Sequence, residues 1–307
     1  MKILVTGGTG MVGTAFKNID TNHDLVLLGS RDCDLTDRSE TKRMLMHFRP
    51  SAIIHLAAKV GGVKGNSDYV ADFFHDNIVM NTNLLDMAKN QGVPKVVSLL
   101  STCIYPDKVK YPLTEDQIHD GEPHRSNFGY AYAKRMLEVH SRAIRQQYGL
   151  NYVTAVPNNL YGKNDNFDLD NGHVIPAIIR KVFESKNSGN VPKFWGTGKP
   201  KREFTYAQDV AKILLWMVEN YEMPEPLNIG NPGDTSIFDL VVKIQSLLDA
   251  NIESRWDDRM PEGQYKKPSS NLRFAELNPG FKYTSLDDGL AETIKWFIDS
   301  YPNVRGI

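Results

Sequence analysis

The chain has 307 residues, of which 41% are hydrophobic and 24% are charged, and its formal net charge at pH 7 is -1. This composition is typical of a globular protein with one large domain or two smaller ones, and the balanced charge excludes a broad surface for nucleic acid or anionic membrane. With two cysteines, no apolar run of membrane-spanning length and no signal-peptide pattern, we expect a cytoplasmic protein with reduced thiols.

Short apolar runs alternate with helical patterns in the first half of the chain. The candidate strands are Lys2–Thr6, Leu25–Leu28, Ala52–Leu56, Lys95–Leu100 and Tyr152–Val156, and the candidate helices are Met11–Ile19, Ser39–Phe48, Ala71–Asn90 and Gly129–Tyr148. Continuous apolar runs suit parallel strands that are buried on both faces. The alternation predicts an α/β fold with a Rossmann-type doubly wound parallel sheet, because right-handed crossovers place helices on both faces.

This alternation weakens after Tyr161, where a polar, turn-rich segment begins. Further helices are predicted at Val174–Glu184, Ala207–Glu219, Thr235–Leu248 and Leu286–Tyr301. We therefore predict a first domain at residues 1–161, to which 203–226 returns. A smaller C-terminal α/β lobe is predicted from residues 162–202 and 227–307, packed on the sheet because no linker separates it.

The loop TGGTGMVG follows the first predicted strand and opens a helix. Gly7, Gly10 and Gly13 stand in a G-x-x-G-x-x-G spacing. Glycines at such positions let the backbone turn tightly and approach a pyrophosphate, which the helix N-terminus then binds. The pattern alone also fits an ordinary strand-to-helix turn, but its place directly after KILVT favours a dinucleotide site. The expected cofactor contacts are Gly7, Gly8, Thr9, Gly10, Met11, Val12 and Gly13.

The second strand ends in LLGSRD, and this end bears on the type of nicotinamide cofactor. An acidic residue here would bind the ribose hydroxyls of NAD. Instead Ser30 and Arg31 occupy the position, and Arg31 could pair with the 2′-phosphate of NADP. Asp32 is close enough that NAD stays an alternative cofactor, and Arg31 by itself could be a solvent-exposed surface charge. The sequence favours NADP(H), with Asp34 and Leu35 against the adenine.

The segment YAYAK places Tyr130 and Lys134 on one face of a predicted helix, four residues apart. A free phenol titrates at about 10, and a neighbouring ammonium favours the phenolate and lowers its pKa. Taken alone, such a pair usually lies on the surface of a helix and has no catalytic function. After a dinucleotide loop and a strand that ends in Ser101, it indicates an acid–base site, where Lys134 can also bind the nicotinamide ribose.

The strand end LLSTCIYP adds a thiol to this site. If the strand stays extended, Ser101 and Cys103 point to one face, because side chains alternate. A thiol titrates at about 8.5 and can exchange protons near neutral pH, although a free cysteine is commonly a small buried hydrophobe. His173, in GHVIPAII, precedes a helix. A thiol and an imidazole facing one substrate could act as base and acid on carbons next to a ketone.

The glycine loop, HLAA at His55–Ala58, Ser101, and Tyr130 with Lys134 together resemble the extended short-chain dehydrogenase/reductase superfamily, over essentially the whole chain. This resemblance implies a serine that positions the substrate carbonyl and a tyrosine that donates or accepts a proton. It also implies hydride transfer at nicotinamide C4. Leu56, Ala57 and Ala58 are accordingly expected to contact the cofactor, and the first domain to bind NADP.

Within that superfamily, the motifs STCIYPDK, SNFGYAYAKRM, NNLYGKNDNF, GHVIPAIIRK, FWGTGKPKREF and EGQYKK are similar to the GDP-L-fucose synthase family. The resemblance implies 3,5-epimerisation of GDP-4-keto-6-deoxy-D-mannose followed by NADPH-dependent reduction at C4. It makes Cys103 the base, His173 the acid and Tyr130 the proton donor to the C4 oxygen. Ser101 hydrogen-bonds that oxygen, and Lys134 tunes the tyrosine. The expected neighbours of the nicotinamide are Pro157, Asn158, Asn159, Leu160 and His173.

The same resemblance implies which residues bind the nucleotide-sugar. Arg202 matches a diphosphate-binding arginine, and Lys181 and Trp195 match substrate-holding positions. Without it, Lys181 reads equally well as a helix surface charge and Trp195 as a core aromatic. Glu262 stands where an aspartate is expected, and Asn158 replaces a more usual threonine. The resemblance also implies a homodimer, through helices that include Gly129–Tyr148.

Two other readings stay open. One is another nucleotide-sugar enzyme of the superfamily, although a 4-epimerase needs no second acid–base pair and a 4,6-dehydratase would show an acidic pair where Thr102 and Cys103 stand. The other is a non-catalytic nucleotide-binding scaffold, against which the complete set of acid–base residues argues. We expect no metal site, because His119 and His124 fit a polar loop.

Overall fold

The computed structural model describes residues 1–61, 68–260 and 265–307. Its larger sheet consists of β1 (Lys2–Thr6), β2 (Asp24–Leu28), β3 (Ala52–His55), β4 (Lys95–Leu99), β5 (Asn151–Val156) and β9 (Leu227–Asn228). The strands lie in the order β2-β1-β3-β4-β5-β9, and every neighbouring pair is parallel. The predicted α/β fold with a doubly wound parallel sheet is confirmed.

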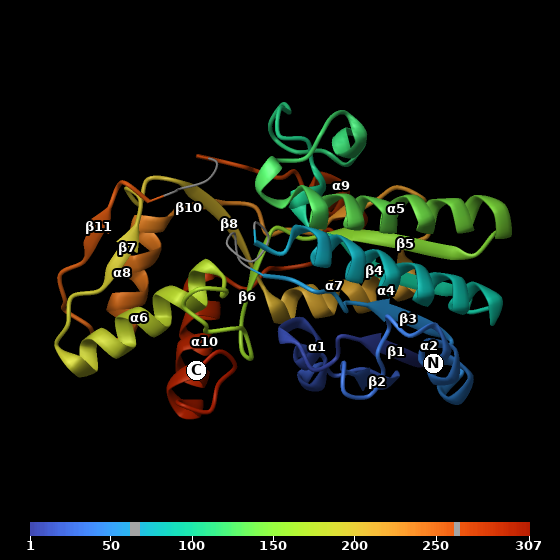
Figure 1. Cartoon of the computed structure of the whole chain (residues 1–307), viewed down its shortest axis with the longest axis horizontal. Coiled ribbons are helices and arrows are strands. Elements are labelled where there is room, and N and C mark those ends of the chain that lie inside the picture. The colour runs from blue at the N-terminus through green and yellow to red at the C-terminus, as the bar shows by residue number, and fades with distance from the viewer. Residues whose placement is uncertain (62–67, 261–264) are drawn as a thin grey trace.

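Helices cover both faces of this sheet, as the alternation of side chains along its strands requires. Ile3 and Val5 of β1 pack with α1 (Met11–Ala15) and α7 (Ala207–Asn220), whereas Leu4 points into a second cluster on the opposite face. That second cluster includes residues of α2 (Arg38–Phe48), α4 (Val70–Asn90) and α5 (Phe128–Tyr148). Figure 1 shows this part of the molecule on the right.

A second body of structure lies beside the large sheet, on the left of Figure 1. It contains the sheets β10-β8-β6 and β11-β7, formed by β6 (Asn159–Tyr161), β7 (Lys193–Trp195), β8 (Lys201–Tyr206), β10 (Asp234–Ser236) and β11 (Arg255–Asp257). Its helices α6 (Val174–Ser188), α8 (Ile237–Leu247) and α10 (Leu286–Ser300) share a third hydrophobic cluster. The short helix α9 (Leu272–Leu277) returns to the first cluster through Phe274.

Several predicted elements differ from the structure in ways that have a local cause. The helix expected at Met11–Ile19 is α1 followed by the 3-10 turn η1 (Phe16–Asn18), and the helix expected from Thr235 begins at Ile237, because residues 234–236 pair with β8. The strand expected to reach Leu100 ends at Leu99. The domain boundaries stay a prediction, although β9, which they assign to the smaller lobe, pairs with β5 of the large sheet.

The path of the chain determines where a ligand can bind. From β1 the chain runs outward to β2 and then crosses to β3 on the other side of β1. The carboxyl ends of β1 and β3 therefore flank a topological switch point, where ligands of open α/β sheets bind. Among the described residues, no helix has both the length and the apolar character needed to cross a membrane.

Candidate active site

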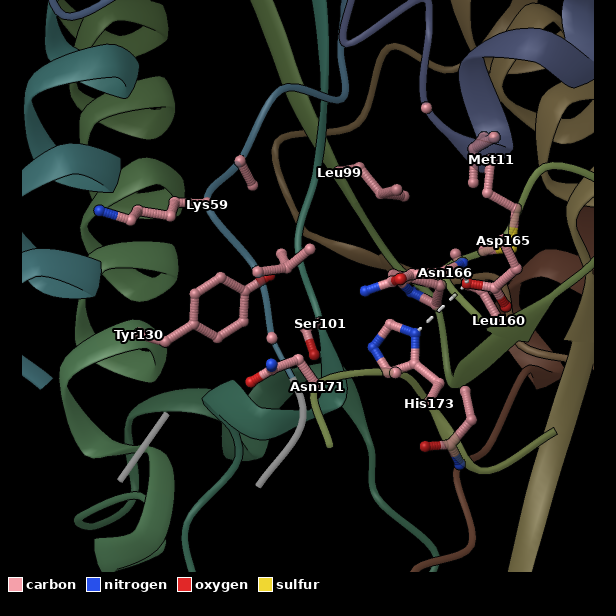
Figure 2. A pocket seen from close by; sticks show the side chains of 18 of the residues that line it. Met11, Lys59, Leu99, Ser101, Tyr130, Leu160, Asp165, Asn166, Asn171 and His173 are labelled. Carbon is pink, nitrogen blue, oxygen red and sulfur yellow. Dashed lines mark hydrogen bonds and ion pairs between the residues drawn. The ribbon is translucent and has the colours of Figure 1, made fainter. Parts of the chain in front are cut away.

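A single cavity of about 1370 Å³ extends from this switch point toward the second body of structure. Most of the residues predicted for cofactor, substrate and catalysis line it: Gly7, Thr9, Gly10, Met11, Val12, Gly13, Asp34, Leu35, Leu56, Ala57, Ala58, Ser101, Cys103, Tyr130, Lys134, Pro157, Asn158, Asn159, Leu160, His173, Lys181, Trp195 and Arg202. Gly8 and Arg31 do not, and Glu262 lies outside the described residues. Figure 2 shows Ser101, Tyr130 and His173 around one space.

The glycine loop leaves no room for side chains. Gly7 has a φ of +71°, and a Cβ there would lie 2.8 Å from the Ala57 nitrogen. A Cβ on Gly13 would lie 2.3 Å from the Gly7 oxygen. Only glycine at position 13 therefore allows α1 to approach the loop this closely. Gly8 is packed on Leu27 of β2, which explains why it does not line the cavity. This cradle, at the start of a helix, fits a pyrophosphate.

The end of β2 bears on the choice between NAD and NADP. The Asp32 carboxylate accepts a hydrogen bond from the Gly29 nitrogen at 2.8 Å, so this acid stabilises the turn after the strand. Ser30 lines the cavity, whereas Arg31 is exposed. The contact of Arg31 with a 2′-phosphate therefore stays a prediction. Asp32, the acid for which NAD was also considered, does not line the cavity.

Tyr130 and Lys134 lie in the first two turns of α5, beside the end of β4. The Lys134 ammonium is buried, donates to the Leu99 oxygen at 2.8 Å and lies 5.9 Å from the centroid of the Tyr130 ring. Burial lowers the pKa of Lys134 to about 8 and raises the pKa of Tyr130 well above its usual value. The expectation that lysine lowers the pKa of this phenol is not met, because desolvation is the larger effect.

Ser101 and Cys103 lie close together because of a turn that was not predicted from the sequence. The strand does not stay extended; it turns at Ser101 into the 3-10 helix η2 (Thr102–Ile104), whose N-cap is the Ser101 side chain. The Ser101 Oγ accepts from the Cys103 nitrogen at 3.3 Å, and both residues still line the cavity. Burial raises the pKa of the Cys103 thiol, and the Ser101 hydroxyl and nearby ammonium groups oppose this rise.

His173 precedes the first turn of α6, on the opposite side of the cavity from the end of β4. Its Nδ1 lies 3.7 Å from Oδ1 of the buried Asp165, the contact that is dashed in Figure 2. This carboxylate raises the pKa of His173 against the effects of burial and of Arg305. The imidazole is therefore biased toward its protonated form, which can deliver a proton.

The far end of the cavity carries basic and aromatic side chains. Lys181 donates to the Lys193 oxygen at 3.2 Å, Arg202 donates to the Lys201 oxygen at 2.8 Å, and Trp195 is 51% exposed. Two cations and an aromatic face at one end of a cavity suit a nucleoside diphosphate. Sequence reasoning missed Lys267, which lines the cavity and lowers the pKa of Cys103 by its charge. Its signal was the motif EGQYKK, from which only Glu262 was selected.

Asn158 lines the cavity and also belongs to a buried network of hydrogen bonds. Its amide nitrogen donates to the Asn231 oxygen at 2.9 Å and to Glu203 at 3.4 Å, and its amide oxygen accepts from the Thr205 hydroxyl at 2.6 Å. Glu203 in turn accepts from the Ser269 hydroxyl and nitrogen. These bonds join β8 to segment 157–160, so they hold the expected nicotinamide neighbours beside the second body of structure.

Comparisons with known proteins agree with this geometry. The model of the NAD dependent epimerase/dehydratase family matches residues 3–230. The chain belongs to that family. A GDP-L-fucose synthase of Dictyostelium discoideum is 41% identical over 99% of this chain and 97% of its own length, and a probable GDP-L-fucose synthase of Drosophila melanogaster is 36% identical over 99% of both.

Among solved structures, a GDP-L-fucose synthetase from Naegleria fowleri bound to NADP superposes with a TM-score of 0.94 at 39% identity, covering 99% of this chain and 94% of that one. The similarity to GDP-L-fucose synthases read from the motifs is thus confirmed. In this member of the NAD dependent epimerase/dehydratase family, Cys103, Tyr130, Lys134 and His173 all line one cavity.

Proposed function

We propose that this chain converts GDP-4-keto-6-deoxy-D-mannose to GDP-L-fucose, first by epimerisation at C3 and C5 and then by NADPH-dependent reduction at C4. The observation that carries the proposal is that Tyr130, Lys134, Cys103 and His173, which we assign to two acid–base pairs, line one cavity. A reductase alone needs only the tyrosine and lysine. The thiol and imidazole add the groups that proton exchange next to a ketone requires.

The glycine cradle and the turn after β2 are assigned to NADPH. When bound, NADPH supplies the hydride for the C4 carbon of the sugar. Residues of the loop 7–13 would hold its pyrophosphate, and segment 157–160 would lie against the nicotinamide. Asp32 accepts a hydrogen bond from the Gly29 nitrogen and does not line the cavity, so we assign the adenosine ribose and its 2′-phosphate to Ser30 and Arg31.

Reduction at C4 is assigned to Tyr130, Ser101 and Lys134. The neutral phenol, which burial favours, donates its proton to the C4 oxygen as the carbonyl becomes an alcohol. The Ser101 hydroxyl donates a second hydrogen bond to the same oxygen and stabilises its developing charge. Lys134, held by the Leu99 oxygen, would bind the nicotinamide ribose beside the tyrosine.

Epimerisation is assigned to Cys103 and His173. The C4 ketone makes the protons on C3 and C5 acidic, and the resulting enolate oxygen lies where Ser101 and Tyr130 can stabilise it. The Cys103 thiolate removes each proton from one face of the ring, and the His173 imidazolium returns one on the other face. Each step then leaves a neutral thiol and a neutral imidazole, which exchange protons with water before the next.

The experiment that tests this function follows NADPH oxidation with GDP-4-keto-6-deoxy-D-mannose, identifies the product by NMR and uses GDP-mannose as the control. The proposal predicts GDP-L-fucose from the keto-sugar and no oxidation with GDP-mannose. An unepimerised 6-deoxy-sugar would show a simple ketoreductase. Binding of nucleotide without oxidation would favour a 4-epimerase or a non-catalytic scaffold.

We also propose a cytoplasmic homodimer. Helices α4 and α5 pack against each other and carry exposed apolar side chains at Phe74, Phe128 and Met136, which are 42%, 47% and 41% exposed. A second copy would bury such side chains. Light scattering coupled to size exclusion should give twice the chain mass, and a monomer at micromolar concentration would contradict the proposal.

A further inference from the structure

Asp165 is a buried carboxylate that the assignments above leave without a role. It lies in the loop between β6 and α6, is 4% exposed and lines the cavity. Its Oδ1 accepts from the Asn166 nitrogen at 2.7 Å, whereas its Oδ2 has no hydrogen-bond partner among the described residues. Burying a carboxylate with so few partners is costly unless an opposite charge compensates it. His173 is placed to be that partner.

The loop that carries Asp165 is fixed to the C-terminal segment of the chain. The Phe167 nitrogen donates to the Arg305 oxygen at 2.8 Å. The Arg180 guanidinium donates to the Phe167 oxygen at 3.1 Å and to the Gly306 oxygen at 2.8 Å. These bonds anchor the loop at Phe167, two residues after Asp165, and so help to hold the carboxylate beside the imidazole.

We propose that Asp165 is a positioning residue for His173, which holds the imidazole with its Nδ1–H toward the carboxylate and its Nε2 toward the substrate. This inference rests on the proposed function. In Figure 2 the imidazole lies between Asp165 and the space beside Ser101, with one ring nitrogen toward each. When Nε2–H gives its proton to the sugar carbon, the ring keeps the Nδ1–H and stays oriented for the next proton.

The charges around His173 support this role. Asp165 raises the pKa of His173, and Arg305, from the C-terminal segment, lowers it by its positive charge; the balance is a raised pKa. The His173 side chain is 48% exposed, so water can return a proton to Nε2 after each transfer. Without the carboxylate, burial and Arg305 would both favour the neutral ring, in either tautomer.

The first test is NMR titration of the imidazole nitrogens in 15N-histidine-labelled protein, with the His173 signals assigned by their loss in His173→Gln. In the wild type we expect a pKa above the usual value of about 6.5 and the Nδ1–H tautomer of the neutral ring. In Asp165→Asn we expect the pKa of His173 to fall, because the carboxylate that raises it is removed. Unchanged titration in this variant would overturn the proposal.

A matched control is Asp168→Asn in the same loop. Asp168 accepts hydrogen bonds from the backbone nitrogens of Asp170 and Asn171, so its replacement disturbs the loop without removing the charge beside His173. We expect the His173 titration to be unchanged there. If Asp165→Asn does not fold, the wild-type titration alone decides, because a pKa at or below the usual value, or the Nε2–H tautomer, contradicts the pairing.

The second readout separates proton delivery from general damage to the site. Asp165→Asn should slow solvent-deuterium incorporation at C3 or C5 by about tenfold or more, while reduction of the already epimerised ketone stays within about twofold. Equal loss of both activities would overturn the proposed role. A wild type that does not turn over the keto-sugar would remove the proposed function, and the NMR titration would still decide the pairing of Asp165 with His173.

Discussion

At the scale of single residues, burial decides the protonation states of the proposed catalytic groups. It raises the pKa of the Cys103 thiol and of the Tyr130 phenol, and only His173, beside a carboxylate, is shifted toward its charged form. A buried phenol that stays neutral suits a proton donor. A buried thiol needs nearby positive charge to become a base, and Lys267 and Lys134 supply it.

Replacing Cys103 by serine should separate the two reactions. The serine hydroxyl cannot ionise near neutral pH, so solvent-deuterium exchange at C3 and C5 should fall by about 10²–10⁴-fold, while reduction of the pre-epimerised ketone persists. Cys33→Ser is the matched control, because it removes the other thiol, which lines the cavity beside Asp34 and Leu35. Equal losses of exchange and reduction in Cys103→Ser would refute its role as base.

Replacing Tyr130 by phenylalanine should abolish reduction and spare binding. Loss of the proton donor is expected to lower kcat for the pre-epimerised ketone by about 10²–10⁴-fold, with the Kd for the GDP-sugar near the wild-type value by calorimetry. Tyr132→Phe, which alters the next tyrosine of α5 outside the cavity lining, is the control. Wild-type turnover in Tyr130→Phe would remove the residue from the mechanism.

At the scale of elements, His55 connects β1, β3 and α4 through hydrogen bonds of its side chain. Its two ring nitrogens lie 2.7 Å from the Thr6 hydroxyl of β1 and 2.9 Å from the Asn81 amide oxygen of α4, while His55 itself ends β3. The ring is fully buried, and burial lowers its pKa to about 3. HLAA, read as a family motif, therefore also holds the switch point in place.

This buried histidine predicts a dependence of stability on pH. Below about pH 6.5 the unfolded chain binds a proton at His55 that the folded chain does not, so the free energy of unfolding should fall by about 2 kcal/mol between pH 7 and pH 5 from this group. Urea denaturation should show a fall smaller by that amount in His55→Gln. Exposed His47→Gln should keep the wild-type fall, and an equal fall in all three proteins would contradict the assignment.

The predictability of the elements follows their burial. The first five strands were predicted to within about one residue because they are continuous apolar runs, and helices cover both faces of the sheet that they form. Strands β7, β9 and β11 span two or three residues. Such short segments are too brief to show the alternation of apolar and polar residues by which a strand is predicted. The turn at Ser101 was missed because a small polar residue fits both an extended strand and an N-cap.

At the scale of the whole molecule, the site exists only where the two bodies of structure meet. The glycine loop, Ser101 and Tyr130 come from the large sheet and its helices, whereas His173, Trp195 and Arg202 come from the second body. Motifs could name most of these residues. They could not show that Asp165 lies against His173 or that Lys267 acts on Cys103, because those contacts depend on how separate segments pack.

Cofactor binding should stabilise the whole chain. A ligand at 100 times its Kd adds about 2.7 kcal/mol to the free energy of unfolding. We expect NADPH to raise the melting temperature more than NADH at equal concentration, because Asp32, the acid that could bind ribose hydroxyls, does not line the cavity. Equal shifts with the two nucleotides in a thermal denaturation series would contradict this preference.

The central claim is that one cavity performs both epimerisation and reduction. The most direct measurement is a single reaction of the wild-type chain with NADPH and GDP-4-keto-6-deoxy-D-mannose in deuterated water, analysed by proton NMR. We predict GDP-L-fucose with deuterium at C3 and C5 and protium, delivered from NADPH, at C4. A reduced sugar with protium at both C3 and C5 would contradict the claim and leave Cys103 and His173 without a catalytic role.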